Sequence, residues 1–344
     1  MNNFFESKVI LVTGGTGSIG SEIVHQLLKM SPRVVRIFSR DEYKQFCIQQ
    51  ELGNRSDVRY LLGDVREGSR LLRAAEGVDI IFHCAAYKHV PFCEYNPFEA
   101  VKTNVIGTQN VIEAALAQGV RKVLLISTDK AASPLNVMGA TKLLAERLMS
   151  STMHSIGSHN TILASVRFGN VLGSRGSVIP LFRDQIAKGG PLTITHPEMT
   201  RFFMSIPQAV KLVFSAAELM KGGELFILKM PAARVGDIAD VLIEVLAPRF
   251  RYDPTSMEKK IIGVRPGEKM FEVLMTKEES EFATESDSMF IVSPYVDLPV
   301  QDPTLHKSAR EKSVTEPRDS YSSDKVHILS KDEIRELLVQ ERVL

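Results

Sequence analysis

Short apolar runs alternate with longer stretches of helical periodicity along the first half of the chain. Runs rich in Val, Ile and Leu occupy residues 8–12, 34–38, 58–62, 79–82, 122–126 and 162–167, and we expect each to be a strand. The connecting stretches 18–29, 41–53, 97–118 and 137–151 have apolar residues at helix spacing, which predicts helices. Because nearly continuous apolar strands separated by helices are covered on both faces, the pattern predicts a doubly wound parallel sheet.

The pattern changes after residue 168, where Gly and Pro accumulate and the apolar runs become shorter. We expect residues 1–168 to form a Rossmann-like dinucleotide-binding domain, to which later strands return, and residues 169–275 to form a smaller substrate-binding lobe. Residues 276–344 are mostly polar, apart from an apolar run at 289–292 and a predicted helix at 331–339. We expect this segment to pack over the lobe or to form an oligomer contact. The expected fold class is therefore α/β with a C-terminal lobe.

The charges of the chain nearly balance, with 42 Lys and Arg against 41 Asp and Glu and a formal net charge of +1. Such a chain has no overall field that would attract nucleic acid or an anionic membrane, so local cations must hold any anionic ligand. No apolar run approaches the roughly 20 residues of a membrane-spanning helix, and the first is too short for a signal sequence. The 3 cysteines suit neither a disulfide framework nor a metal site. These features predict a cytoplasmic enzyme without a bound metal.

A glycine-rich turn directly follows the first predicted strand. Residues 13–20 read TGGTGSIG, in which Gly14, Gly17 and Gly20 have the spacing of a dinucleotide-binding fingerprint. One glycine turns the chain, one lets backbone amides approach the pyrophosphate, and one lets the helix pack on the strand. The N-terminus of that helix offers N–H groups and a positive dipole to the phosphates. The cofactor contacts predicted here are Gly14, Thr16, Gly17, Ser18, Ile19 and Gly20.

The end of the second strand indicates which dinucleotide is bound. An NAD site has a carboxylate here for the ribose hydroxyls, whereas this chain has Ser39 followed by Arg40. An arginine in this place can bind a 2′-phosphate through charge-assisted hydrogen bonds, which favours NADP. Asp41, one residue further, keeps NAD as the alternative.

Two further strand ends are expected to contribute to the same site. Asp64 and Val65 follow the third strand and should contact the adenine, whose exocyclic amine can donate to the carboxylate. Ala85 and Ala86 follow the fourth strand and are small enough for the backbone to lie against the cofactor.

The fifth strand ends in residues with acid–base chemistry. Asp129 and Lys130 follow it closely, at the edge of the sheet where a nicotinamide ring would lie. Lys142 comes four residues after Met138 on a predicted helix, and hence on the same face. In this spacing the lysine ordinarily holds the nicotinamide ribose, while the residue at the Met138 position removes a hydroxyl proton. A thioether cannot accept that proton, so the chemistry is either lost or carried by Asp129 and Lys130.

Several motifs in order along the chain resemble one enzyme family. They read GGTGSIG, SRDE, GDVR, AAYKHVPFCEYNPFEAVKTNVIGTQNV, STDKAASPLNVMGATKLLAE, RFGNVLGSRGSVIPLF, ITHPEMTRFFM, GVRPGEKMFE and YSSDK. Together they resemble the UDP-N-acetylglucosamine 4,6-dehydratases, extended short-chain dehydrogenase/reductases of polysaccharide biosynthesis. The resemblance extends from about residue 8 to the C-terminus. It is to the short form of the family, which lacks the long N-terminal segment of membrane-anchored relatives.

The resemblance implies a reaction without net oxidation of UDP-N-acetylglucosamine. NADP takes a hydride from C4 and later returns it to C6, and between these steps the C5 proton and the C6 hydroxyl are lost. The resemblance assigns Asp129 as the acid for the C6 hydroxyl, Lys130 as the base at C5, and Thr128 as a hydrogen-bond partner of the C4 hydroxyl. Asp129 and Lys130 can do this if their surroundings shift both pKa values toward neutrality.

Met138 leaves one proton without an assigned acceptor. Some members of the family have tyrosine at this position and others have methionine, so the elimination pair is unaffected. The candidates for the acceptor of the C4 hydroxyl proton are Thr128 with a water molecule, Lys130, and Tyr87 in the loop after the fourth strand.

A nucleotide-sugar substrate carries a pyrophosphate and needs local positive charge. Arg201 and Arg265 are the best candidates, because arginine binds phosphate oxygens bidentately. The resemblance assigns Arg265 to the UDP part and Glu268 to a ribose or sugar hydroxyl. The other substrate contacts that it implies are Lys88, Asn170 and Val171.

Two other functions are still open from the sequence. A UDP-sugar 4-epimerase on the same scaffold also oxidises C4, but it needs the missing tyrosine and has no need of Asp129 and Lys130. A non-catalytic NADP-binding regulator would explain Met138, but it has no reason to retain Asp129, Lys130 and Lys142 together. We therefore expect a homo-oligomeric enzyme that uses UDP-N-acetylglucosamine and NADP and has no nucleic-acid partner.

Overall fold

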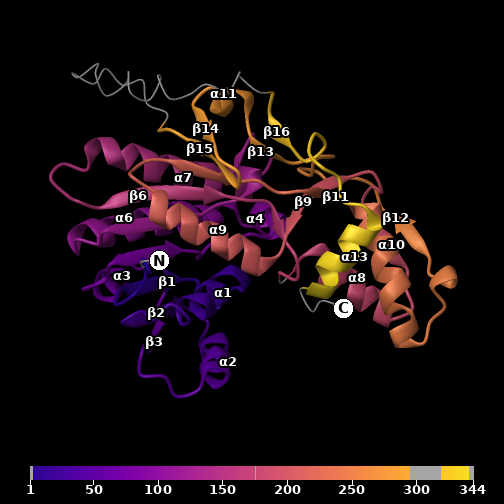
Figure 1. The fold of residues 1–344 in the computed structure, drawn as a ribbon, viewed down its shortest axis with the longest axis horizontal. Coiled ribbons are helices and arrows are strands. Elements are labelled where there is room, and N and C mark those ends of the chain that lie inside the picture. The colour runs from indigo at the N-terminus through magenta and orange to yellow at the C-terminus, as the bar shows by residue number, and fades with distance from the viewer. Residues whose placement is uncertain (1–2, 175, 295–318, 341–344) are drawn as a thin grey trace.

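A computed structural model of the chain describes residues 3–174, 176–294 and 319–340 and is shown in Figure 1. Its central feature, within these residues, is a nine-stranded sheet. The strands are β1 (Val9–Thr13), β2 (Val34–Ser39), β3 (Val58–Leu62), β4 (Ile80–His83), β5 (Lys122–Ile126), β6 (Ile162–Arg167), β10 (Leu225–Leu228), β14 (Ala283–Glu285) and β15 (Met289–Val292). Their order is β14-β15-β10-β6-β5-β4-β1-β2-β3, so the chain moves outward from β1 and then returns to place β4 beside it.

Most of the sheet is parallel, as the sequence predicts. The strands from β3 to β10 are joined through parallel pairs, and β15 and β14 add an antiparallel edge. The strands expected from the apolar runs are confirmed, with ends that differ by at most one residue. β14 and β15 come from the C-terminal segment 276–344, so this part of the segment lies in the central sheet and not over the lobe.

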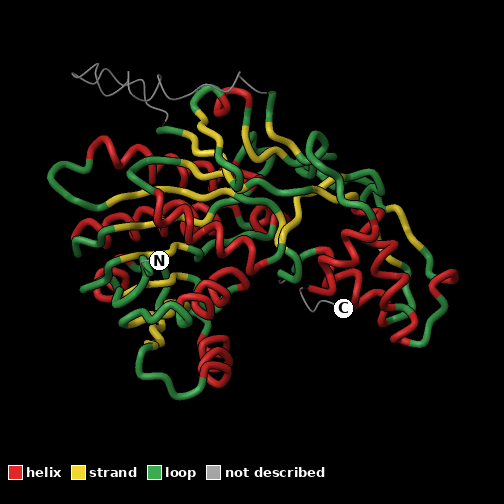
Figure 2. Tube along the Cα trace, viewed as in Figure 1, coloured by secondary structure: helices red, strands yellow, loops and turns green. Residues whose placement is uncertain are grey.

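Helices cover both faces of the sheet (Figure 2). Alternate side chains of β1 explain this, because Ile10 and Val12 belong to one core cluster while Val9 and Leu11 belong to another. The first cluster includes α1 (Ser18–Leu27), α2 (Glu42–Leu52) and α9 (Ile206–Leu219), and the second includes α3 (Gly68–Ala74), α6 (Gly107–Ala117) and α7 (Val137–Ser155). The fold is therefore the predicted Rossmann-like, doubly wound α/β architecture.

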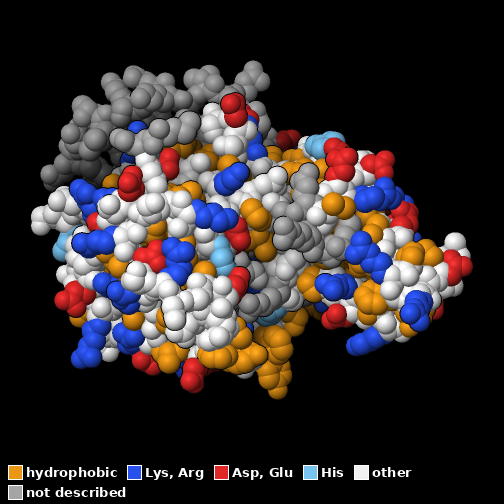
Figure 3. All heavy atoms as spheres, turned by 60° about the horizontal axis from the view of Figure 1, so that its bottom comes forward, with side chains coloured by type: hydrophobic (Ala, Val, Ile, Leu, Met, Phe, Trp, Pro, Cys, Tyr) orange, Lys and Arg blue, Asp and Glu red, His pale blue; other side chains and the backbone are white. Residues whose placement is uncertain are grey.

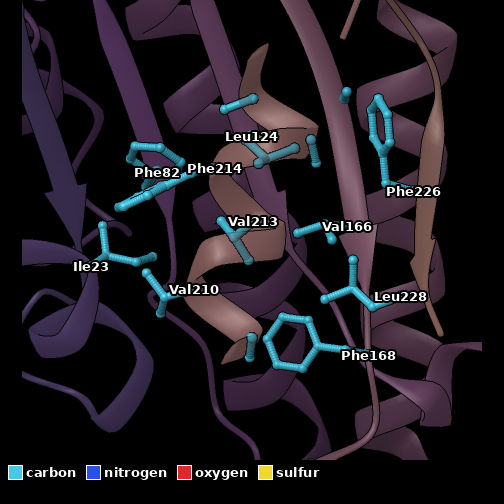
Figure 4. Packing of buried hydrophobic residues seen from close by; sticks show 14 of the residues in the cluster. Ile23, Phe82, Leu124, Val166, Phe168, Val210, Val213, Phe214, Phe226 and Leu228 are labelled. Atoms are coloured by element: carbon cyan, nitrogen blue, oxygen red, sulfur yellow. The ribbon is translucent and has the colours of Figure 1, made fainter. Parts of the chain in front are cut away.

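The helix α9 covers the middle of one face, as Figure 4 shows. Its Phe214 packs on Phe82 of β4 with ring centroids 5.6 Å apart, and Val210 lies one turn away in the same cluster. The helix begins at a capping box, in which Ser205 and Gln208 each accept a hydrogen bond from the backbone N–H of the other. This helix comes from the part of the sequence that was expected to form the lobe, so the later chain supplies helix as well as strand to the first domain.

The predicted helix 97–118 is interrupted. It consists of α5 (Pro97–Ala100), a π-helical turn (Val101–Ile106) and α6, and a short helix that periodicity did not predict, α4 (Val90–Tyr95), precedes it. The π-helical turn contains the buried Asn104, whose Oδ1 accepts from the N–H of Tyr87 at 2.8 Å. The Nδ2 of Asn104 donates to Thr141 of α7 at 3.0 Å. The irregular turn thus joins the loop after β4 to α7.

A second hydrophobic core builds the smaller lobe, with buried residues that include Phe182, Leu242 and Leu338. Its elements are β7 (Asn170–Val171), α8 (Val178–Ala187), β8 (Leu192–Ile194), β9 (Thr200–Met204), β11 (Ala232–Arg234), α10 (Val235–Leu246), β12 (Lys259–Ile261) and α13 (Lys331–Gln340). The helix α13 confirms the one predicted at 331–339, and its Lys331 pairs with Asp240 of α10 at 2.7 Å. The helices α8, α10 and α13 lie together at the right of Figure 1. The connecting elements are two 3₁₀ turns (Pro248–Phe250 and Pro254–Ser256), β13 (Val273–Met275), α11 (Lys277–Ser280) and β16 (Tyr321–Ser322).

One buried arginine joins the sheet to α7 and to the C-terminal segment. Arg167, at the end of β6, has no exposed surface and lies between Glu146 of α7 and Glu279 of α11. Its Nη2 is 2.6 Å from Glu146 Oε2, and its Nη1 is 2.8 Å from Glu279 Oε2. Burial alone would lower the pKa of this guanidinium, but the two carboxylates raise it. Arg167 therefore links β6 to α7 and to α11 through two buried ion pairs.

Replacement of Arg167 by leucine should leave two buried carboxylates without their partner. We expect Arg167→Leu to lower the free energy of unfolding by about 3–5 kcal/mol, measured by urea titration with circular dichroism. The matched control is Arg335→Leu, which removes a solvent-exposed guanidinium that pairs with Asp332 and Glu244 and should cost less than about 1 kcal/mol. Equal losses in the two variants would contradict the central role of Arg167.

Candidate active site

The carboxyl ends of the parallel strands open into a large cleft. Its volume of about 740 Å³ is in the range of sites that bind small organic ligands. The cleft lies where β4 returns beside β1, the position at which doubly wound sheets bind ligands. The cofactor contacts predicted from the sequence all line it: Gly14, Thr16, Gly17, Ser18, Ile19, Gly20, Ser39, Arg40, Asp41, Asp64, Val65, Ala85, Ala86 and Lys142.

The structure brings most of the other predicted residues to the same cleft. Those in its lining are Lys88, Thr128, Lys130, Asn170, Val171, Arg201 and Glu268. Asp129 is covered by its neighbours, with 1% of its side chain exposed. Arg265 is outside the lining, with 51% of its side chain exposed and its Nη1 3.8 Å from Glu268 Oε1. Of the predicted substrate contacts, Arg265 is thus the one that the fold does not bring into the cleft.

The turn after β1 has the geometry of a phosphate-binding loop. Gly14 has a φ of 65°, and a Cβ atom there would lie 2.7 Å from the amide nitrogen of Ala85. A Cβ atom on Gly20 would collide with the backbone carbonyl of Gly14. Gly17 precedes α1 and provides no side-chain cap, which leaves the first N–H groups of the helix for a phosphate. The residues present therefore fit the pyrophosphate of a dinucleotide.

Ser39 and Asp41, at the end of β2, make different contacts. The hydroxyl groups of Ser39 and Thr16 are hydrogen-bonded at 2.8 Å. Asp41 caps α2 by accepting from the N–H of Lys44 at 3.0 Å, and its carboxylate pairs with the ammonium of the same lysine at 2.6 Å. The carboxylate that kept NAD as an alternative is thus engaged in starting a helix.

Arg40 lies over an aromatic ring at the same end of the cleft. Its guanidinium is 4.9 Å from the centroid of Tyr87 and 3.5 Å from Asp64 Oδ2. Burial alone would raise the pKa of Asp64, but hydrogen bonds from Arg66 keep it below its usual value. Tyr87 therefore lies beside the loops that follow β2 and β3. Tyr87 also packs against the apolar cluster that contains Met138 and lines the cleft together with Thr128 and Lys130, so all three stay candidates for the acceptor of the C4 hydroxyl proton.

Thr128, Asp129 and Lys130 form one hydrogen-bonded group directly after β5. Thr128 precedes a single turn of 3₁₀ helix (Asp129–Ala131), and its Oγ1 donates to Asp129 Oδ1 at 2.8 Å. Lys130 Nζ donates to the same oxygen at 3.0 Å. Asp129 Oδ2 is buried and has no hydrogen-bond partner among the described residues. The acid and the base expected from the sequence are therefore in direct contact.

A second carboxylate, which the sequence analysis did not single out, also faces Lys130. Glu272 Oε1 is 3.4 Å from Lys130 Nζ and 3.7 Å from Arg201 Nε, and 4% of the Glu272 side chain is exposed. Burial alone would lower the pKa of Lys130, but Asp129 and Glu272 raise it. The pKa of Lys130 is therefore shifted away from neutrality in the free protein, so this lysine does not meet the condition set by its role as a base. Two carboxylates surround its ammonium instead of one.

The helix α7 packs directly on this turn. Asn136 caps the helix by accepting from the N–H of Gly139 at 2.8 Å, and a Cβ atom on Gly139 would collide with the carbonyl of Lys130. Met138 is 3% exposed and packs in a small apolar cluster. Lys142 Nζ donates to Ile126 O at 2.7 Å, and burial lowers its pKa to about 8. The helix therefore brings Lys142 to the end of β5.

Arg201, in the lining of the cleft, and the neighbouring Lys269 are cationic groups near the place of an anionic substrate. Arg201 is 8% exposed, and its guanidinium donates to Thr200 O at 2.7 Å and to Lys269 O at 2.9 Å. Lys269 Nζ donates in turn to Ser133 O at 2.6 Å. On the face shown in Figure 3, basic and acidic side chains are interspersed.

Asn104, Ser127 and Glu146, which were not identified from the sequence, support the cleft through tertiary contacts. Asn104 holds the loop after β4, and Ser127 Oγ hydrogen-bonds to Glu146, which also binds Arg167. Asn104 lies within the quoted string VKTNVIGTQNV, but no local pattern distinguishes a buried asparagine from an exposed one. Their roles depend on partners that lie far away in the sequence.

Two negative findings apply to residues 3–174, 176–294 and 319–340. No helix among them is both long enough and apolar enough to cross a membrane. No group of three or more His, Cys, Asp or Glu side chains among them is arranged to hold a metal ion. The homo-oligomeric state, the cytoplasmic location and the absence of a metal stay predictions of the sequence.

Comparison with known proteins places the chain in a family. A sequence profile of the polysaccharide biosynthesis protein family matches residues 10–294. The chain belongs to this family. It is 58% identical over 295 residues to an uncharacterised membrane protein of Methanocaldococcus jannaschii, covering 86% of this chain and 88% of the relative. It is also 42% identical over 324 residues to an inverting UDP-N-acetylglucosamine 4,6-dehydratase of Campylobacter jejuni, covering 93% of each chain.

Two further proteins are similar to this chain. The chain is 40% identical over 343 residues to a UDP-glucose 4-epimerase of Rickettsia rickettsii, covering 97% of this chain and 96% of the relative. The solved structure of Pen from Bacillus thuringiensis has a TM-score of 0.90 and 46% identity, and the match covers 99% of both chains. Together the matches confirm the resemblance to the UDP-N-acetylglucosamine 4,6-dehydratase family, the extended short-chain dehydrogenase/reductase fold, and the expectation of an enzyme.

The glycine turn provides a test of the dinucleotide site. Gly20→Ala places a Cβ atom against the Gly14 carbonyl, so we expect the affinity for NADP or NAD to fall by more than about tenfold, measured by calorimetric titration. Gly68→Ala is the matched control, because the nearest atom to its Cβ would be 3.6 Å away and affinity should not change. A Gly20→Ala variant that folds and binds dinucleotide like the wild type would show that the pyrophosphate lies elsewhere.

Proposed function

We propose that this enzyme dehydrates UDP-N-acetylglucosamine to a UDP-4-keto-6-deoxy-N-acetylhexosamine, with NADP as its cofactor, in surface glycan biosynthesis. The observation that carries the proposal is the contact between Thr128, Asp129 and Lys130 at the wall of the dinucleotide cleft. Elimination of water needs an acid and a base at neighbouring carbon atoms, whereas hydride transfer alone does not. The 42% identity to the Campylobacter dehydratase over 93% of the chain supports this choice.

The cofactor end of the cleft favours NADP. Arg40 lines the cleft and would exchange its 3.5 Å contact with Asp64 for a 2′-phosphate, beside the Ser39 hydroxyl, whereas Asp41 caps α2 and pairs with Lys44. A bound dinucleotide would supply the redox chemistry, as the store for the hydride removed from C4 and restored at C6. Lys142 would hold the nicotinamide ribose, and its pKa of about 8 keeps it a cation at neutral pH.

The hydrogen bond from Thr128 to Asp129 provides a path for the C4 proton. In this scheme the C4 hydroxyl donates to Thr128 Oγ1, which already donates to Asp129 Oδ1 at 2.8 Å. A proton that enters the chain at Thr128 leaves Asp129 protonated. Thr128 thereby takes the place of the tyrosine that Met138 replaces, and the oxidation step prepares Asp129 as an acid.

The elimination then uses both members of the pair. Protonated Asp129 donates to the C6 hydroxyl as its bond to carbon breaks, and Lys130 removes the proton from C5. Their separation of 3.0 Å lets one group act at each of two neighbouring carbon atoms. Arg201, Asn170 and Val171 line the same cleft and would contact the diphosphate and the sugar.

A UDP-sugar 4-epimerase is the second candidate function, favoured by the 40% identity to the Rickettsia protein. An epimerase must present both faces of the 4-keto sugar to the cofactor and needs no acid–base pair at C5 and C6. It would leave the buried contact between Asp129 and Lys130 without a chemical role. A non-catalytic regulator is disfavoured for the same reason.

One assay distinguishes these functions. The wild type is incubated with UDP-N-acetylglucosamine in deuterated water and the reaction is monitored by NMR. We expect a 4-keto-6-deoxy product with deuterium at C5. UDP-N-acetylgalactosamine as the product would support the epimerase instead. No turnover by protein with bound NADP would rule out both enzymes.

The role of Lys130 is tested by substitution. Lys130→Ala should slow formation of the 4-keto-6-deoxy product by about 100-fold or more, because the base at C5 is lost, while cofactor binding is retained. Lys102→Ala removes an exposed lysine outside the cleft that pairs with Glu99, and it should turn over like the wild type. Normal turnover by Lys130→Ala would mean that another group is the base.

Arg40 should decide the preference for NADP over NAD. Arg40→Ala removes the cation at the end of β2, so we expect the dissociation constant for NADP to rise by about tenfold or more. The dissociation constant for NAD, which has no 2′-phosphate, should change little. Parallel titrations with both dinucleotides measure this, and an equal change for the two would argue against a 2′-phosphate contact.

A further inference from the structure

Five charged side chains meet at the end of β5, and two of them, Glu272 and Lys269, have no role in the scheme so far. Asp129 and Glu272 are both within 3.4 Å of the Lys130 ammonium. Arg201 from β9 is 3.7 Å from Glu272, and Lys269, from the loop before β13, interacts electrostatically with Glu272 and Asp129. Glu272 lines the cleft, and its Oε2 is buried without a hydrogen-bond partner among the described residues. A buried carboxylate oxygen without a donor is costly, which indicates that it binds a proton or a ligand during the reaction.

Lys130 faces a difficulty as a base. The free protein holds it as an ammonium, because the two neighbouring carboxylates raise its pKa against the effect of burial. An ammonium has three donors and no acceptor, so it cannot remove the C5 proton. Asp129 cannot accept the proton of Lys130, because in the proposed reaction Asp129 receives the C4 proton through Thr128. A second acceptor must therefore contact Lys130.

We propose that Glu272 is this acceptor: it takes the proton from Lys130 before the elimination and returns it afterwards. The inference rests on the dehydratase function proposed above. The two groups are 3.4 Å apart, close enough for direct transfer after a small movement. The transfer stays within the cluster and turns an ion pair into two neutral groups. It therefore leaves the net charge of the buried site unchanged.

The protons balance through the cycle. At the start, Lys130 carries one proton, and Asp129 and Glu272 carry none. The C4 proton passes through Thr128 to Asp129, and the Lys130 proton passes to Glu272. The C5–H bond then breaks as an N–H bond forms on Lys130, its electron pair forms the C5–C6 double bond, and the C6 hydroxyl leaves as water with the proton of Asp129. The hydride stored on the dinucleotide would then add to C6 and its electron pair would reduce the double bond. C5 regains a proton from Lys130, directly or through water, and Glu272 returns its proton to Lys130.

The C-terminal segment holds Glu272 in place. The backbone N–H of Glu272 donates to Ser323 Oγ at 3.0 Å, and the N–H of Ser323 donates to Glu272 O at 2.9 Å. Ser323 has no exposed surface, and its Oγ is 2.9 Å from Oγ1 of Thr200, the neighbour of Arg201. Ser323 is thus a positioning residue that fixes both Glu272 and the strand that carries Arg201. This contact accounts for the motif YSSDK, which has no part in the chemistry itself.

The test is the nearly isosteric variant Glu272→Gln, which keeps the backbone bonds to Ser323 and removes the proton acceptor. Lys130 must then lose its proton to solvent. We expect the ratio of the Glu272→Gln rate to the wild-type rate to be about one tenth or less near pH 7 and to recover as the pH rises toward about 9. The ratio cancels the titration of Lys142, which both proteins share. Glu272→Asp should restore part of the activity, with a ratio to the wild type that changes little with pH. Glu113→Gln, an exposed glutamate on α6, is the matched control and should behave like the wild type.

A second readout needs neither cofactor nor turnover. The pH dependence of Lys130 acetylation, followed by mass spectrometry, reports the pKa of its amine, which should be lower in Glu272→Gln than in the wild type because one carboxylate is gone. An unchanged pKa, wild-type turnover with a level pH profile, or an equal loss of turnover at every pH would overturn the relay. A wild type without dehydratase activity would instead overturn the proposed function, and the relay with it.

Discussion

The ion pairs of the buried Arg167 are the interaction on which the arrangement of the active site depends. The guanidinium binds Glu146 of α7 and Glu279 of α11, and Glu146 also accepts a hydrogen bond from Ser127 at the end of β5. The helix α7 carries Lys142, and the segment before α11 carries Glu272. One cation therefore holds together three parts of the chain that bring charged groups to the cleft. Its own charge is kept in the interior only because both carboxylates are present.

The charged groups of the cleft lie close together because a parallel sheet has the carboxyl ends of its strands at one edge. Strands that run in one direction release their loops at one edge, and here the loops after β1, β2, β4 and β5 all line the same cleft. The close packing of α7 on the turn at Lys130 requires Gly139, and the turn in that place directs the lysine between two carboxylates. The charge state of Lys130 is thus a property of the assembled cluster and not of the doublet alone.

Much of the fold and part of the site could be predicted because they depend on local patterns. Apolar runs of strand length and the glycine spacing at 14–20 report directly on backbone geometry, and the structure agrees with both. The helix expected at 97–118 is interrupted by a π-helical turn that carries Asn104, and both hydrogen-bond partners of Asn104 are distant in the sequence. The apolar run at 289–292 was recognised, but its place in the central sheet depends on antiparallel pairing with β10.

The sequence by itself determined the α/β class, the glycine-rich turn, and the adjacent carboxylate and ammonium of Asp129 and Lys130 after the fifth strand, because each needs only neighbours along the chain. Only the tertiary structure decided the protonation of Lys130 and the presence of Glu272 beside it. Glu272 is far from Lys130 in the sequence, and the contact exists because Ser323 and Arg167 fix the C-terminal segment against the sheet. Electrostatic free energy depends on distance through space, and no periodicity or motif encodes that distance.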